Sequence, residues 1–276
     1  MVAIDIWKFQ ERGKLLYTVS SICLHPAMDF TIVIPARLKS TRLPGKVLAD
    51  LGGKPLLKHV WDAAMRVHGA KKVVVLTESQ DVKEVVDSWG GICHLTPESC
   101  NSGTERISSA LDLIDGDYIF NIQSDEPFLD INLIDRMIAR ARRDQKFDIL
   151  TPIYEIDETQ AILNPNVVKV VLYHDDFAIY FSRSPIPHVR GMDTSQRLHH
   201  TIYWGHMGVY LYRRKVLEDL ASIPESPLAT VESLEQLRFL QAGYRIGTIR
   251  AAGGSIAIDV PEDLAHARVI WNERKN

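Results

Sequence analysis

Basic side chains gather in one short stretch that directly follows an apolar run. The run Phe30–Ile34 is followed by "PARLKSTRLPGK", which carries Arg37, Arg42 and Lys46. Arginine presents a planar set of donors that matches phosphate oxygens, and lysine adds a compact point charge. Gly45 would let the backbone approach an anion closely. The stretch therefore predicts a site for the phosphates of a nucleotide, with a solvated basic loop as the alternative.

Two common phosphate-binding patterns do not fit this stretch. Val47 stands where GxxxxGK[ST] requires a hydroxyl residue, and the upstream glycine of that pattern is missing. The glycine spacing of GxGxxG is absent as well. A phosphate site here would have to be of another type.

The elements around this loop indicate an α/β fold. Short β-rich runs alternate with amphipathic stretches from Phe30 onward, which predicts a mostly parallel central sheet with helices on both faces. Ligands of such sheets bind beyond the carboxyl ends of the strands, where the basic loop would lie. The expected strands are 30–34, 72–76, 91–95 and 118–122, and the expected helices are 55–67, 80–89, 102–114 and 131–143.

The second half of the chain has a different rhythm. Strands are expected at 167–173, 178–183, 204–213 and 244–250, separated mainly by loops, which favours antiparallel pairing. Helices are expected at 231–243 and 261–272. We expect one domain over 28–276, with a nucleotide half at about 28–150 and a smaller mixed or antiparallel region at about 151–250. Residues 1–27 are interpreted as an N-terminal extension outside the core fold.

Composition excludes several classes of protein. The net charge of −3 over 276 residues argues against a non-specific nucleic-acid binder. The three cysteines, Cys23, Cys93 and Cys100, contain no CxxC pair, which argues against a disulfide framework and a zinc site. No apolar run approaches the roughly 20 residues of a membrane-spanning helix. We expect a cytoplasmic protein without membrane insertion or nucleic-acid partners.

Eight sequence blocks follow one another in a recognisable order. The blocks are "IPAR" with "STRLPGK", "SGTER" (102–106), "NIQSDEP" (121–127), "NPNVVKVV" (164–171), "YFSRSPIP" (180–187), "HMGVY" (206–210), "ESLEQLR" (232–238) and "DVPED" (259–263). Together they resemble the 3-deoxy-manno-octulosonate (Kdo) cytidylyltransferases, Rossmann-like sugar nucleotidyltransferases that make CMP-Kdo for lipopolysaccharide. The resemblance runs from about Met28 almost to the end.

The resemblance implies a reaction and a catalytic set. CTP and Kdo would give CMP-Kdo and pyrophosphate when the anomeric hydroxyl attacks the α-phosphorus, a displacement that depends on positioning and charge neutralisation. Arg37, Arg42 and Lys46 would bind the triphosphate, with Lys46 closest to the α-phosphate. Asp125 and Asp259 would hold Mg²⁺. Without the resemblance, the positions of these residues would indicate a turn cap for Asp125 and a helix cap for Asp259.

The same resemblance assigns residues to the cytosine and ribose. Ser102, Gly103 and Gln123 would surround these groups. Taken alone, Ser102 and Glu105 have the spacing of a capping box, so a purely structural role is the alternative.

On the sugar side the resemblance points to Arg183, His206, Glu232 and Gln236. An acidic sugar needs one cation for its carboxylate and several polar partners for its hydroxyls. The spacing of Glu232 and Gln236 would place both on one helix face. The alternatives are a half-buried strand histidine for His206 and a solvated helix surface for Glu232 with Arg238.

One position departs from the family pattern. The usual NxQGDEP carries serine here at position 124 in place of glycine. If that glycine had a positive φ or lay against the substrate, Ser124 would add strain or a new hydroxyl contact. Altered kinetics, a preference for an analogue such as 8-amino-Kdo, or no effect are the possible results.

Other functions and partners stay open at this level. The chain could activate another acidic sugar, such as sialic or legionaminic acid, or it could be a non-catalytic nucleotide-binding module. Retention of Lys46, Asp125 and Asp259 together speaks against the module. By analogy we expect a homodimer, with the apolar stretch "WGHMGVYLY" (204–212) as a surface buried between subunits.

Overall fold

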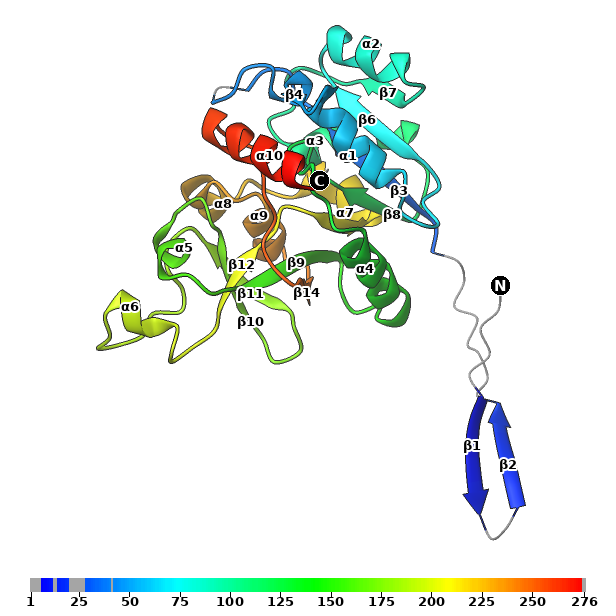
Figure 1. The fold of residues 1–276 in the computed structure, drawn as a ribbon, viewed down its shortest axis with the longest axis vertical. Helices are drawn as coiled ribbons and strands as arrows, with labels where there is room; N and C mark the ends of the chain where they lie inside the picture. Colours follow the sequence, from blue (N-terminus) through cyan, green and yellow to red (C-terminus); the bar gives the residue numbers. More distant parts are fainter. Residues whose placement is uncertain (1–5, 12–13, 20–27, 41, 275–276) are drawn as a thin grey trace.

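The computed structural model describes residues 6–11, 14–19, 28–40 and 42–274. Within these residues one ten-stranded sheet dominates, in the order β11-β10-β12-β9-β13-β8-β3-β6-β7, with β14 beside β9 (Figure 1). Its strands are β3 (Phe30–Pro35), β6 (Val73–Thr77), β7 (Ile92–Leu95), β8 (Tyr118–Asn121), β9 (Ile149–Ile156), β10 (Lys169–Leu172), β11 (Ala178–Ser182), β12 (Tyr203–His206), β13 (Tyr210–Arg213) and β14 (Ile246–Arg250).

Helices cover this sheet and short elements complete the fold. The helices are α1 (Leu56–Ala64), α2 (Gln80–Ser88), α3 (Gly103–Ser108), α4 (Ile131–Arg143), α5 (Thr159–Leu163), α6 (Thr194–Arg197), α7 (Arg214–Asp219), α8 (Pro227–Glu232), α9 (Gln236–Gln241) and α10 (Pro261–Glu273). A small hairpin pairs β4 (Asp50–Leu51) with β5 (Lys54–Pro55). The strands β1 (Ile6–Glu11) and β2 (Lys14–Val19) pair only with each other, in a sheet separate from the main one.

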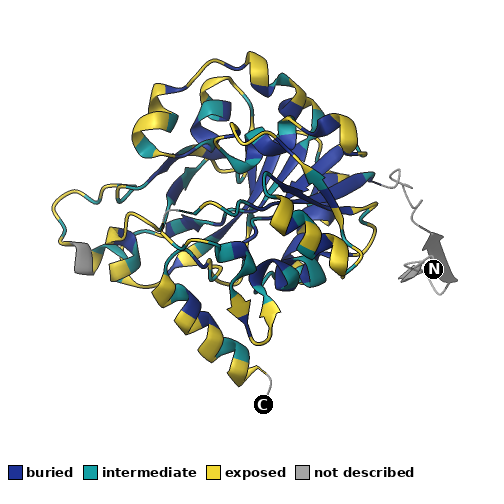
Figure 2. Ribbon diagram, turned by 90° about the horizontal axis from the view of Figure 1, so that it is seen from above, coloured by how far each residue is buried: buried dark blue, intermediate teal, exposed yellow. Residues whose placement is uncertain are grey.

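The parallel half of the sheet has the predicted form. The strands β8, β3, β6 and β7 pair in parallel, and every residue of β3 is buried. Because side chains alternate along a strand, Ile32 belongs to the core beneath α1, α2 and α4. Val33 belongs to the core beneath α3, α7 and α9. The two cores confirm helices on both faces, and the buried strands form the interior of the body (Figure 2).

The antiparallel half contains two features that the sequence did not reveal. The strand β9 was not predicted, although it lies near the centre of the sheet between β12 and β13. The run 204–213, expected to be one strand, is two: β12 lies on one side of β9 and β13 on the other. Thr151 of β9 secures the crossing, because its hydroxyl contacts the carbonyl oxygens of Met207 and Val209 at 3.1 and 2.8 Å.

The predicted helix 231–243 is also divided. Ser233 has a φ of 52°, in the left-handed region, and it ends α8 before α9 begins at Gln236. Two predictions were therefore wrong: the single helix, and the placement of Glu232 and Gln236 on one face of it. A continuous helical pattern in the sequence concealed this break, because serine is not the residue that usually marks a left-handed helix end.

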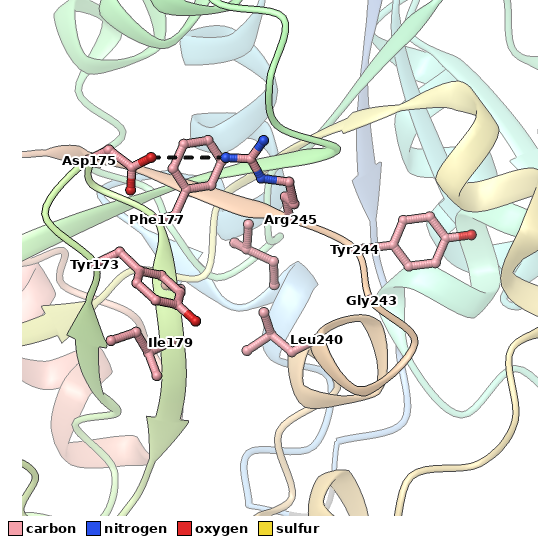
Figure 3. Close-up of a pocket in the computed structure, with 10 residues that line it drawn as sticks. Tyr173, Asp175, Phe177, Ile179, Leu240, Gly243, Tyr244 and Arg245 are labelled. Atoms are coloured by element: carbon pink, nitrogen blue, oxygen red, sulfur yellow. Dashed lines mark ion pairs between the residues drawn. The ribbon is translucent and has the colours of Figure 1, made fainter.

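The stretch 204–212 contains both buried and partly buried side chains. Met207, Val209, Leu211 and Tyr212 are buried within this chain, whereas Trp204 and Tyr210 are only partly buried. The dimer surface at this stretch stays a prediction. Exposed apolar side chains also lie at the sheet edge, where β10 and β11 meet. Tyr173 and Ile179 border a cavity of about 480 Å³ there, and Arg245 and Asp175 in its lining form an ion pair (Figure 3).

Candidate functional site

Lys46 joins the two aspartates that the sequence assigned to a metal site. Its Nζ lies 2.7 Å from Oδ2 of Asp125 and 3.1 Å from Oδ1 of Asp259, residues far apart in the sequence. Asp125 follows β8, Asp259 precedes α10, and Lys46 begins the short 3-10 helix Lys46–Leu48. Arg42 adds a contact of 3.2 Å to the same oxygen of Asp259. The fold therefore concentrates charge of both signs at the carboxyl end of the parallel strands.

The charge state of Lys46 follows from this arrangement. Burial of its side chain, only 12% exposed, acts to lower its pKa. The nearby carboxylates of Asp125 and Asp259 outweigh burial, so the net pKa of Lys46 is raised above its ordinary value. The ammonium group is consequently charged at neutral pH.

The basic loop is held by a glycine turn and a buried ion pair. Gly45 has a φ of 68°, which suits glycine, and it precedes Lys46 directly. Beneath the loop, Glu78 accepts a hydrogen bond of 3.0 Å from the amide of Leu38. Glu78 also lies 3.0 Å from the guanidinium of Arg106, whose side chain is 1% exposed. This buried pair fixes the loop from below, and the sequence reading did not anticipate it.

The loop opens onto a cavity of about 300 Å³, here called the first cavity. Arg37, Arg42 and Lys46 line it together with Lys39, and Arg37 also donates to the carbonyl oxygen of Cys100. The opposite wall comes from Gly103 at the start of α3 and from the segment 123–125. The cations predicted from the sequence thus share one cavity with Gly103, Gln123 and both aspartates.

The N-terminus of α3 shows how Ser102 is used. Its hydroxyl accepts the amide hydrogen of Glu105 at 3.1 Å, so the predicted cap is present. The same hydroxyl donates to the carboxylate of Glu235 just before α9. At Gly103 a Cβ would lie 3.0 Å from Pro35, so only glycine fits without displacement of that neighbour. Gly103 therefore lets the start of α3 pack closely against β3.

A second cavity of about 340 Å³ adjoins the first. Both cavities are lined by Gln123, Asp125 and Asp259, which form the boundary between them. His206 and Gln236 line the second cavity and not the first. Their role as sugar-side residues stays a prediction. No lysine or arginine lines the second cavity among the described residues, so the expected cation for a sugar carboxylate is not in this wall.

His206 is neutral in this environment. Its ring packs between Phe181 and Tyr210, and its Nε2 lies 2.9 Å from the hydroxyl of Thr151. Burial lowers the pKa of His206 to about 3. The imidazole can exchange hydrogen bonds with a hydroxyl-rich ligand, but it carries no charge for a carboxylate at neutral pH.

Arg183 and Glu232 lie outside the lining of the second cavity. The guanidinium of Arg183 donates to the carbonyl oxygens of Glu232, Pro165 and Ser233 at 2.7, 2.8 and 3.2 Å. The carboxylate of Glu232 accepts from the hydroxyl of Ser182 at 2.6 Å and from the amide of Arg183 at 2.8 Å. Both side chains are occupied in joining strand and helix ends. Their assignment to sugar contacts stays a prediction.

The structure adds polar residues to the second cavity that sequence reasoning had not assigned. Glu126, Asn166, Tyr210 and Ser255 line it, and Ser255 donates to Glu126 at 3.0 Å. Burial, reinforced by the charge of Asp125, raises the pKa of Glu126 to about 7. Glu126 and Asn166 belong to the quoted blocks "NIQSDEP" and "NPNVVKVV", which were the available signal.

Ser124 lines the first cavity and not the second. Ser124 is 8% exposed. The described non-glycine residues with positive φ are Asp176 and Ser233, so Ser124 is not one of them. The backbone-strain interpretation of this serine is therefore excluded. Its position allows a hydroxyl contact with a ligand of the first cavity.

The donor set at the boundary suits a hard cation. Asp125 and Asp259 converge on one ammonium nitrogen, so their oxygens already surround a point of positive charge. Mg²⁺ typically takes one or two carboxylates and completes its shell with water and substrate phosphate. No cluster of three or more histidine, cysteine or acidic ligands occurs among the described residues.

The fold and site define a nucleotidyltransferase: a mixed α/β sheet with a parallel half, a cationic loop after the first strand of that half, and paired aspartates facing the loop. The family model described as cytidylyltransferase matches residues 31–246. This chain therefore belongs to the cytidylyltransferase family.

Similar proteins place it more closely within that family. The 3-deoxy-manno-octulosonate cytidylyltransferase of Chloroherpeton thalassium is 40% identical over 245 residues, covering 88% of this chain and 98% of that protein. The protein of the same name from Elusimicrobium minutum is 42% identical over 240 residues, covering 87% and 97%.

Solved structures agree with this placement. A CMP:2-keto-3-deoxy-manno-octonic acid synthetase complexed with CTP has a TM-score of 0.83 at 35% identity, covering 89% of this chain and 99% of that one. The inositol-1-phosphate CTP transferase from T. maritima shares the fold alone, with a TM-score of 0.62 at 14% identity, covering 91% and 98%. None of the helices that the structure describes is long and apolar enough to span a bilayer.

Proposed function

We propose that this protein transfers CMP from CTP to Kdo and releases pyrophosphate. The observation that carries the proposal is the boundary formed by Gln123, Asp125 and Asp259 between two cavities. The first cavity is lined by basic residues, and the second by neutral polar and acidic residues. A transfer between two substrates needs the reacting atoms to meet at such a boundary. The relatives named above, similar over nearly their whole length, support the choice of CTP and Kdo.

The first cavity would receive the triphosphate. Arg37, Arg42 and Lys46 line it and offer donors to phosphate oxygens, and Gly103 lines the same cavity, where the nucleoside would lie. Lys46 stands closest to the boundary, since it contacts both aspartates that line the two cavities. Its charge is therefore available where negative charge redistributes during transfer.

The paired aspartates would hold Mg²⁺. The ion would supply charge neutralisation at the transferring phosphoryl group and polarise its oxygens. Lys46 occupies the space between Asp125 and Asp259, so its ammonium group would turn toward the phosphates when a cation binds to these carboxylates. The bound cation would thus replace the ammonium group of Lys46 as the positive charge beside Asp125 and Asp259, so neither aspartate would be left unpaired.

The second cavity would receive the sugar. Neutral His206 and the amide of Gln236 can bind hydroxyls, and Tyr210 and Asn166 add further polar groups. Because no described lining residue is cationic, we propose that amide and hydroxyl donors of this wall would bind the sugar carboxylate. This arrangement orients the acceptor hydroxyl toward the boundary residues.

One experiment tests the function and its sugar. Pyrophosphate release would be followed with CTP and Mg²⁺ while Kdo, 8-amino-Kdo and sialic acid are offered separately. We expect release with Kdo, and none when EDTA replaces Mg²⁺. Turnover of only another acidic sugar would overturn the assignment of the second cavity, and no release with any acceptor would overturn the enzyme proposal itself. The cytoplasmic location and the homodimer stay predictions, to be checked by cell fractionation and by light scattering.

A further inference from the structure

A second concentration of positive charge lies outside the catalytic region, between α4 and β14. Arg136, Arg140 and Arg143 of α4, together with Arg250 at the end of β14, line a cavity of about 490 Å³. Asp176, from the turn between β10 and β11, is the one carboxylate in this lining. We call this site the arginine cavity. Its excess of positive charge contrasts with the net charge of −3 of the whole chain.

Backbone contacts fix two of these guanidinium groups. Arg136 donates to the carbonyl oxygen of Arg250, and Arg140 donates to that of Thr248. Each bond uses one of the five N–H donors of an arginine, so further donors remain for a ligand. Arg140 also forms a long ion pair of 3.9 Å with Asp144, which lies outside the lining. The two guanidinium groups are therefore oriented in advance, and Arg136 has no ion pair with any described residue.

The other two arginines complete the charge imbalance. Arg250 is 3.0 Å from Asp176 and stacks on the ring of Trp204 at 5.0 Å. The side chain of Arg143 makes no hydrogen bond or ion pair with any residue in the described part of the chain. Like charges that share one cavity repel each other, and a bound anion relieves this repulsion.

A purely structural explanation covers only part of the site. The contacts of Arg136 and Arg140 tie α4 to β14, and the helix dipole favours cations in the last turn of α4. That dipole acts on Arg142 and Arg143 alike, yet Arg143 lines the cavity and Arg142 does not. Arg142 and Arg143 therefore form a matched pair: both carry a positive charge in the last turn of α4, and only Arg143 lines the cavity.

We propose that the arginine cavity binds a small, multiply charged phosphate compound, of the class of nucleotides and inorganic polyphosphates. Guanidinium groups bind phosphate through paired hydrogen bonds, and several of them match several negative charges. A phospholipid headgroup presents the same phosphate chemistry, but commonly as a singly charged diester. The excess of three positive charges in the lining favours the free, multiply charged compound.

Calorimetric titration with inorganic tripolyphosphate tests this proposal on the full chain. The catalytic loop is also expected to bind the probe, so the wild-type protein should show two classes of site. The double variant R143Q/R250Q should lose one class, or bind it at least roughly tenfold more weakly, as expected when charge-assisted hydrogen bonds are removed. The matched variant R142Q should keep both classes. Circular dichroism and pyrophosphate release report on folding, because Arg143 and Arg250 line neither catalytic cavity.

Three results would overturn the proposal. The first is a single class of site in the wild-type protein. The second is equal weakening by R142Q, which would show a diffuse charge effect rather than a site. The third concerns binding to lipid vesicles with and without phosphatidylglycerol. If the protein binds the anionic vesicles but not tripolyphosphate, and R143Q/R250Q loses the vesicle binding, the cavity is a site for a lipid headgroup.

Discussion

The hydroxyl of Ser102 donates a hydrogen bond to the carboxylate of Glu235, although the two residues are 133 positions apart. Ser102 begins the helix that brings Gly103 to the first cavity. Glu235 precedes Gln236, which lines the second. This bond therefore joins one wall of the first cavity to one wall of the second cavity.

Removal of Glu235 should disturb both substrates together. We expect Glu235→Ala to raise the KM values for CTP and for the acceptor sugar. Each should rise by roughly tenfold, which corresponds to the free energy lost with one charge-assisted hydrogen bond. Glu235→Gln keeps an acceptor for Ser102 and should have a smaller effect. Steady-state kinetics with each substrate varied would measure this, with the exposed Glu225→Ala as control. A change in only one KM would contradict the coupling.

Lys46→Met should reduce kcat and leave the fold intact. Loss of one preorganised charge at a developing negative charge typically costs roughly a hundredfold to a thousandfold in rate. Lys39, in the same loop, is 78% exposed and pairs with Glu98. Lys39→Met should change the rate no more than a few-fold. Equal losses in the two variants would show that the loop needs only its overall charge.

Ser124→Gly tests the departure from the family pattern. Because Ser124 lines the first cavity only, we expect the KM for CTP to change and the KM for the sugar to stay constant. Glycine also increases the entropy of the unfolded chain, which should lower stability by about 0.5–1 kcal/mol. Kinetics with both substrates and urea unfolding give the two numbers. A shift in sugar preference would contradict the placement.

Arg183→Met separates a structural role from a sugar contact. Three carbonyl oxygens would lose a charged donor, which should lower the free energy of unfolding by about 2–4 kcal/mol at roughly 1 kcal/mol or more for each bond. Urea unfolding measures this loss, and the exposed Arg190→Met serves as control. Unchanged stability with a large rise in the sugar KM would instead support direct binding of the sugar carboxylate.

Lys169 should give the protein a characteristic pH dependence. Burial, reinforced by the charge of Arg183, lowers the pKa of Lys169 to about 8 from 10.5, against the opposing effect of Glu232. Its Nζ meets the carbonyl oxygens of Asn164, Val167 and Arg183. The unfolded chain holds this proton more tightly, so the contribution of Lys169 to stability rises as the pH increases from about 8 to 10.5.

Urea unfolding between pH 7 and 10.5 would measure that contribution. Lys169→Met lacks the titration, so the wild-type curve should rise relative to the variant by about 3 kcal/mol over this range, at 1.36 kcal/mol for each pKa unit. Parallel curves would show that Lys169 does not titrate there. Because the variant serves as the reference at every pH, its own lower or higher stability does not affect the comparison.

The sequence alone was sufficient for the parallel half and for the cationic loop. Strong alternation of buried β-rich runs with amphipathic helices specifies β3, β6, β7 and β8 locally. The loop residues Arg37, Arg42 and Lys46 lie close together in the chain, so they share a cavity almost by necessity. The ordered blocks also indicated the family, because residue identities carry that signal without any coordinates.

Tertiary structure decided everything that depends on contacts between distant segments. The strand β9 gains its position from β12, β13 and β14 on its two sides, and no local pattern distinguishes a strand that is completed by such partners. The break at Ser233 and the diversion of Arg183 to carbonyl oxygens follow from how strand and helix ends meet. The pairing of Lys46 with Asp125 and Asp259 arises for the same reason: residue types determine which charges are available, but only the folded chain determines which of them meet.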